Sequence, residues 1–163
     1  MTNIAFVLSV LMGVGSLSGG YASQGLIQEA RGFLIFGALW LFARWRKWKW
    51  FHSPGLLIVV FAAAYGLWIG LAFGWMILGS VGGLLAWDLA NFSRRLTYAS
   101  PTDDIAGMER VHILRAGMVA AFGALLAFLA FFVHLQMKFE IIVGLVVLVV
   151  IGLARLVVTL RRE

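Results

Sequence analysis

Asp88 is the side chain in this sequence best placed to do chemistry. It is the first formal charge in the apolar stretch from Pro54 to Asn91. A carboxylate inside a membrane is costly unless it faces protein, water or a cation, and such residues often mark proton or cation pathways. We therefore expect Asp88 to be either one member of a structural polar pair or a proton or cation site.

The position of Asp88 predicts its partner. Asp88 precedes the pair Arg94 and Arg95 by the same number of residues as Arg155 precedes Arg161 and Arg162. Opposite charges at equal depth in neighbouring helices lower the cost of burying either one, so we predict an intramembrane pair between Asp88 and Arg155. Arg115 and Asn91 are the alternative partners. The equal offset reflects either a short internal repeat or chance.

The three histidines, His52, His112 and His134, are the candidate haem or metal ligands. A transmembrane b-type haem needs two imidazoles that face each other from different helices. Only His52 and His112 are expected on the same side of the membrane, and both lie at helix starts. No HxxxH or HExxH spacing is present. We therefore expect no metal and no cofactor.

Motifs for catalysis are missing as well. The run Gly79 to Gly83 reads GSVGG and does not meet the GxSxG order of a serine nucleophile turn. The sequence contains no Walker glycine loop, dinucleotide fingerprint or aspartate-rich metal motif. There is no cysteine, which removes thiolate nucleophiles and disulfides. We expect a protein that is not an enzyme and has no catalytic residues.

The elements that position these residues are membrane helices. A crossing needs about 20 apolar residues, so the stretch from Pro54 to Asn91 predicts a helical hairpin. The whole chain fits an all-α, polytopic membrane helix bundle with about six transmembrane helices in three hairpins. The expected helices are 3–20, 24–45, 54–71, 74–92, 115–135 and 140–160, with a short cytoplasmic helical segment at 101–114. Ser100 is expected to cap that segment and Pro101 to begin it.

The distribution of positive charge predicts the orientation. With the N-terminus inside, eleven of the thirteen Lys and Arg residues fall on the cytoplasmic side. They are Arg44, Arg46, Lys47, Lys49, Arg94, Arg95, Arg110, Arg115, Arg155, Arg161 and Arg162, and only Arg31 and Lys138 lie outside. We expect both termini to be cytoplasmic and the protein to lie in the inner or plasma membrane.

Composition agrees with an integral membrane protein. Hydrophobic residues make up 63% of the chain and charged residues 12%, against about 25% charged in a soluble domain. The 163 residues leave room for one integral membrane domain, 1–163. The net charge of +6 lies beside apolar segments, which favours anionic lipid over nucleic acid as a partner. An uncleaved first helix is favoured over a signal peptide at residues 1–22, because the first residues lack a positive charge.

Two further patterns concern contacts. Small residues recur at spacings of three and four, which predicts helix-packing seams. The seams comprise Gly79, Gly83, Ala86 and Ala90 in one helix and Ala116, Ala120, Gly123 and Ala127 in another. Tryptophan alternates with cations in a basic aromatic patch, which predicts contact with the headgroups on the cytoplasmic side. This patch comprises Arg44, Trp45, Arg46, Lys47, Trp48, Lys49 and Trp50.

These observations favour a non-enzymatic structural or accessory subunit that acts through helix packing and lipid contact. Membrane lipids are the expected partners, anionic on the cytoplasmic side, together with other membrane subunits or a second copy. The alternative is a small channel or transporter with a polar cytoplasmic entrance around Asp88, Asn91 and Arg155.

Overall fold

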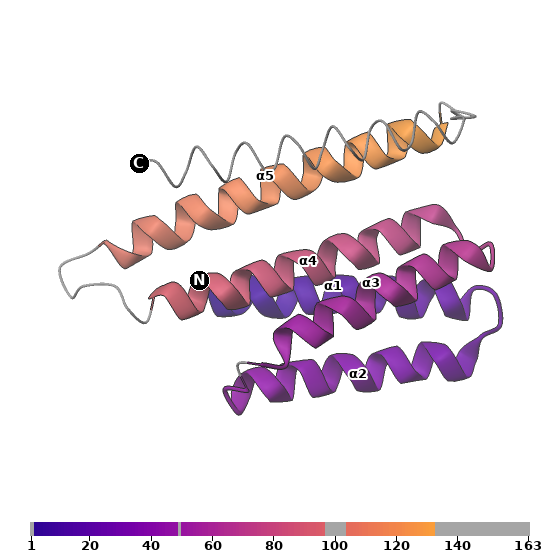
Figure 1. The fold of residues 1–163 in the computed structure, drawn as a ribbon, viewed down its shortest axis with the longest axis horizontal. Helices are drawn as coiled ribbons and strands as arrows, with labels where there is room; N and C mark the ends of the chain where they lie inside the picture. The colour runs from indigo at the N-terminus through magenta and orange to yellow at the C-terminus, as the bar shows by residue number, and fades with distance from the viewer. Residues whose placement is uncertain (1, 49, 97–103, 133–163) are drawn as a thin grey trace. The chain divides into compact units, whose positions relative to one another are not determined.

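The computed structural model describes residues 2–48, 50–96 and 104–132. Within these ranges every regular element is an α-helix: α1 (Thr2–Ala22), α2 (Ile27–Trp45), α3 (His52–Trp68), α4 (Phe73–Leu96) and α5 (Ile105–Phe132) (Figure 1). The chain divides into two compact units, Met1–Phe128 and Leu129–Glu163. The first unit holds α1 to α4 and most of α5. The prediction of an all-helical fold is confirmed for the described residues.

Three of these helices are long and apolar enough to cross a membrane. They comprise Thr2–Ala22, Phe73–Leu96 and, within α5, Ala106–Leu129. The α3 helix is apolar but has only 17 residues, and α2 carries Glu29, Arg31 and Arg44. The helices expected at 3–20, 24–45, 54–71 and 74–92 coincide with α1 to α4, with ends that differ by at most four residues. The helix expected at 140–160 lies outside the described residues.

Consecutive helices among α1 to α4 run in opposite directions. Asn3, Arg44, His52 and Arg94 line one pocket, which brings the starts of α1 and α3 to the ends of α2 and α4. Near the opposite end, the Tyr21 hydroxyl donates a 2.8 Å hydrogen bond to the Ala62 carbonyl oxygen. Gly25 and Gly70 have φ values of +80° and +85° in the two turns at that end, a conformation that costs glycine little.

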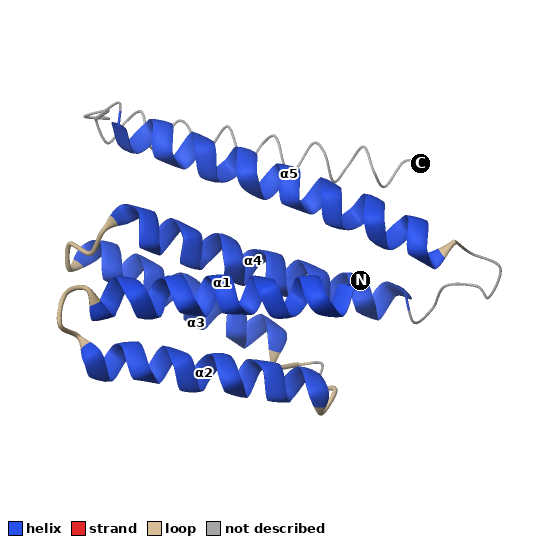
Figure 2. Ribbon diagram, turned by 180° about the vertical axis from the view of Figure 1, so that it is seen from behind, coloured by secondary structure: helices blue, strands red, loops and turns tan. Residues whose placement is uncertain are grey.

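The core of the bundle forms around α1, which lies between α2 and α4 (Figure 2). Its large side chains on the packed faces, including Phe6, Leu17 and Tyr21, are almost fully buried. Where α1 crosses α4 the backbones touch: a Cβ on Gly82 would come 2.5 Å from the Gly13 Cα atom and 2.8 Å from the Ser9 carbonyl oxygen. This approach suits lipid, where helices associate by close packing rather than by a hydrophobic drive.

The predicted seam on α4 lies within this contact region. A Cβ on Gly79 would meet the Leu17 side chain at 2.8 Å, and one on Gly83 would meet Val59 at 2.7 Å. Ala86 and Ala90 are fully buried. The seam residues of α4 therefore contact both α1 and α3.

The α5 helix is continuous from Ile105 to Phe132, so residues 105–114 of the expected cytoplasmic segment belong to the same helix as the expected crossing. The cap that the structure shows is Asp104, whose Oδ1 accepts a 3.0 Å hydrogen bond from the Gly107 amide. The predicted cap Ser100 and helix start Pro101 lie outside the described residues.

Candidate functional site

Asp88 on α4 contacts His112 on α5. The distance between Asp88 Oδ2 and His112 Nε2 is 2.8 Å. The two side chains are half-buried, with 38% of Asp88 and 28% of His112 exposed. One turn further along α4, the Phe92 ring stacks on the imidazole, with a centroid distance of 3.8 Å and an interplanar angle of 6°. Because Asp88 and Phe92 are four residues apart, they share a face of α4. The Asp88 carboxylate and the Phe92 ring can therefore contact the same imidazole.

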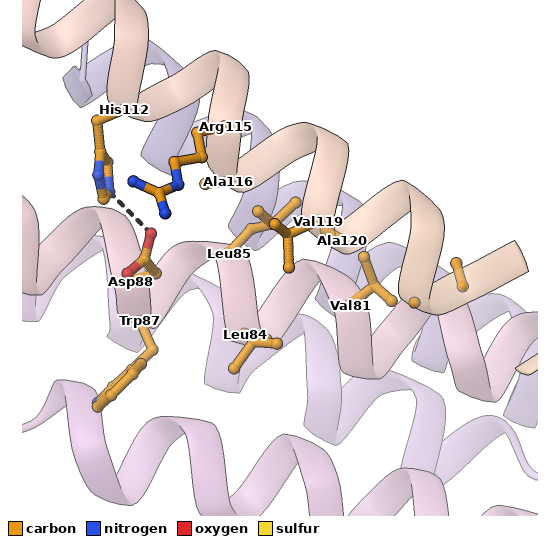
Figure 3. A pocket seen from close by; sticks show the side chains of 12 residues that line it. Val81, Leu84, Leu85, Trp87, Asp88, His112, Arg115, Ala116, Val119 and Ala120 are labelled. Atoms are coloured by element: carbon orange, nitrogen blue, oxygen red, sulfur yellow. Dashed lines mark hydrogen bonds and ion pairs between the residues drawn. The ribbon is translucent and has the colours of Figure 1, made fainter. Parts of the chain in front are cut away.

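This pair lies at the edge of a cavity of about 630 Å³ between α4 and α5. The walls are mostly apolar, with Leu85 from α4 and Val119 from α5 among them. Figure 3 shows the Arg115 guanidinium pointing into the cavity beside Asp88 and His112. One acid, one imidazole and one guanidinium therefore share an apolar cavity.

The second predicted seam lines the same cavity. Ala116, Ala120 and Gly123 are among its wall residues. A Cβ on Gly123 would meet no atom of the described chain within 4 Å, in contrast to Gly83. Ala120 is buried, and Ala127 is half-buried outside the cavity lining. The small residues of α5 therefore border a cavity, whereas the small residues of α4 allow close contact between helices.

The arrangement can hold a proton or tie α5 to α4. A neutral imidazole protonated on Nε2 donates to the carboxylate, whereas an imidazolium forms an ion pair with it. In both states the hydrogen bond compensates the Asp88 charge, which is the condition for keeping a carboxylate at membrane depth. Arg115 adds a positive charge to the same cavity.

The other polar residues that the sequence indicated lie as follows. Arg155 is outside the described residues, so its pairing with Asp88 stays a prediction. Asn91 Oδ1 accepts a 2.5 Å hydrogen bond from Arg94. Sequence reasoning missed the contact with His112, although a signal existed. Asp88 lies eight residues before the end of α4 at Leu96, and His112 lies seven residues after the start of α5 at Ile105.

The basic aromatic patch divides into two groups in the structure. Arg44, Trp45 and Lys47 line a second cavity, of about 730 Å³. Arg46, Trp48 and Trp50 are exposed and do not line this cavity. Lys49 lies outside the described residues.

Among the residues that the structure describes, no group of three or more His, Asp or Glu side chains is placed to hold a metal ion. His52 and His112 each have a different partner: Trp40 Nε1 donates to His52 Nδ1 at 3.2 Å, and His112 contacts Asp88. His134 lies outside the described residues. Comparison of the chain with known protein families, with curated proteins and with solved structures finds no match.

The Asp88 and His112 side chains should be coupled in stability. We expect Asp88→Ala and His112→Ala to show a coupling free energy of about 1 kcal/mol in a double-mutant cycle, the lower part of the range for a charged hydrogen bond because both groups are half-exposed. Unfolding in detergent measures it. The same cycle between Asp88→Ala and Arg46→Ala serves as the control and should give no coupling. A zero value for both cycles would show that the contact does not stabilise the fold.

Proposed function

We propose that the chain is a non-enzymatic, multi-pass membrane protein that acts as a structural or accessory subunit through helix packing and lipid contact. In this proposal it crosses the inner or plasma membrane six times in three hairpins, with both termini in the cytoplasm. The charge bias and the three long apolar helices support the arrangement.

The observation that carries the subunit proposal is the outer face of α5. Five large apolar side chains follow one another at spacings of three and four residues, and each is more than half exposed. They are Val111, Leu114, Met118, Phe122 and Leu125. Such spacing places them on one face of the helix, the arrangement by which an apolar helix contacts a neighbouring helix. The apolar face therefore supports contact with another membrane protein.

A pair of matched variants tests the subunit role. Met118→Ala with Phe122→Ala keeps α5 apolar but shortens the side chains of the outer face. Phe61→Ala makes the same change on α3, where Phe61 is 71% exposed. We expect the wild type and Phe61→Ala, extracted in native-membrane discs, each to co-purify with one partner membrane protein in fixed stoichiometry. The α5 variant should lose this partner. Purification of all three as lipid-bound monomers would refute the proposal.

Labelling tests the topology. Cysteines introduced at Lys47 and Thr102 should react with an impermeant reagent only from the cytoplasmic side, and one at Lys138 only from outside, because positive charge marks cytoplasmic loops. The chain has no native cysteine, so each label reports one site. Opposite accessibility of the Lys47 and Thr102 positions would be incompatible with six crossings.

The second candidate function is a small channel or transporter, which the cavity beside Asp88 and His112 favours. In that case Asp88, with Asn91 and Arg155, would line a cytoplasmic entrance. Asp88→Asn removes the charge while preserving size, so it should change proton or ion flux in liposomes if the chain transports. Flux that equals the background of empty liposomes, for wild type and variant alike, would rule this candidate out.

A further inference from the structure

The second cavity lies where the ends of α1, α2, α3 and α4 meet. Three cationic residues line it: Arg44 from α2, Lys47 from the loop that follows and Arg94 from α4. None of its described lining residues is acidic. The chain therefore concentrates positive charge from three segments around one hollow.

The Arg44 side chain is held in place. Its Nη2 donates a 2.8 Å hydrogen bond to Asn3 Oδ1, and its guanidinium lies over the Phe6 ring, 4.8 Å from the centroid. A guanidinium fixed in this way loses little freedom when it binds an anion, and its planar donors suit phosphate oxygens.

Lys47 lines the cavity at a cost in backbone energy. Its φ of 59° makes it the one non-glycine residue with positive φ in the described chain. The Lys47 amide donates to the Arg44 carbonyl oxygen and the Trp48 amide to that of Ala43, which is the Schellman motif that ends a helix. Glycine is the usual residue at this left-handed position because it lacks Cβ strain. A lysine there is the kind of local strain that functional sites retain.

His52 lines the same cavity, and only 5% of its surface is exposed. Burial, together with the positive charges of Arg44 and Arg94, lowers the pKa of this imidazole to about 4. The ring is therefore neutral at physiological pH, and its Nδ1 accepts a hydrogen bond from Trp40 Nε1. This leaves Nε2 as the protonated nitrogen, a neutral donor beside the cations.

We propose that this cavity binds a phosphate group, supplied by the headgroup of an anionic phospholipid. Arg44 and Lys47 contact the phosphate oxygens, and Val7, Leu41 and Trp45, which also line the cavity, contact the glycerol and the first acyl carbons. The volume of about 730 Å³ exceeds what a phosphate ion fills and suits a headgroup with the start of its chains. The lipid source rests on the proposed membrane arrangement, which places this end of the bundle at headgroup depth.

Native mass spectrometry of the purified full chain, titrated with phosphatidylglycerol, tests the site. We expect Lys47→Gly and Arg44→Gln each to weaken binding about fivefold, the factor that corresponds to about 1 kcal/mol for one cation. Arg46→Gln removes a neighbouring cation that does not line the cavity and should weaken binding less than twofold. Lys47→Gly should also raise the melting temperature, because glycine relieves the strain at this position. A fold defect therefore cannot explain its loss of binding.

Three results would overturn the proposal. Equal losses for Arg46→Gln and Lys47→Gly would show general surface attraction instead of a site. Undiminished binding to Lys47→Gly together with Arg44→Gln would place the lipid elsewhere. Saturable binding of inorganic phosphate without binding of phosphatidylglycerol would assign the site to a free anion. The subunit role is measured separately through the α5 variants, so its failure would leave this binding result unchanged.

Discussion

Gly82→Ala should lower the free energy of unfolding of the bundle by about 3 kcal/mol or more. The added methyl group would lie 2.5 Å from the Gly13 Cα atom and 2.8 Å from the Ser9 carbonyl oxygen. Overpacking typically costs about 1 to 3 kcal/mol when side chains can adjust. Here the neighbours are backbone atoms of α1 that cannot rotate away, so the helices must separate. Unfolding in mixed micelles or a thermal melt in detergent measures the loss.

Gly15→Ala provides the control, because it adds the same methyl group to α1, the helix that Gly82 contacts. Gly15 lies on α1, two residues from Gly13, and a Cβ there would meet no described atom within 4 Å. Alanine is favoured over glycine in a helix interior by about 0.5 to 1 kcal/mol, so this variant should be as stable as the wild type or slightly more stable. Equal melting temperatures for Gly15→Ala and Gly82→Ala would show that the α1 and α4 backbones are not in contact.

The two seams of small residues show how far spacing alone can predict packing. Gly83 and Gly123 belong to seams with the same alternation of small residues. A Cβ on Gly83 would clash with Val59, whereas Gly123 borders a cavity. Spacing identifies which residues share a face of a helix. It does not identify what lies opposite that face, because this depends on how far apart the two helices are held.

The positions of the helices could also be predicted in part from the sequence. Turn residues and runs of charge located the ends of α1 to α4 within four residues, since the end of an apolar run is visible in the sequence. The start of α5 was less visible because Ser100, Asp103 and Asp104 are all good cap residues, and the choice among them depends on the loop geometry. The structure shows a cap at Asp104.

The partner of Asp88 could not be read from residue types. The expected depth in the membrane restricts the candidates to groups that the sequence predicts at the same end of neighbouring helices. These include His112, Arg115 and Arg155. Choosing among them needs the rotation of α5 about its axis. In the structure this rotation places His112 between Phe92 and Asp88, a contact that combines ring stacking with a hydrogen bond.

Trp40→Ala should destabilise the bundle by about 3 to 5 kcal/mol, the range for removing a fully buried tryptophan. Trp40 is fully buried on α2, and Gly55 allows the α3 backbone to close over its indole: a Cβ on Gly55 would lie 2.9 Å from Trp40 Cε2. Alanine leaves a cavity that neighbouring side chains cannot fill. The substitution also removes the indole N–H that donates a hydrogen bond to His52 Nδ1. Unfolding in detergent measures the total loss.

Two further variants separate the contributions to the Trp40 effect. Trp40→Phe keeps much of the ring volume but deprives the buried His52 of its donor, so it should cost about 1 to 3 kcal/mol. Trp68→Ala makes the same truncation at a side chain that is 83% exposed and should change stability by less than about 0.5 kcal/mol. If Trp40→Ala and Trp68→Ala melted alike, α2 would not be packed against α3 as the structure places it. In that case His52, which lines the second cavity and accepts the hydrogen bond from Trp40, would also lose its support.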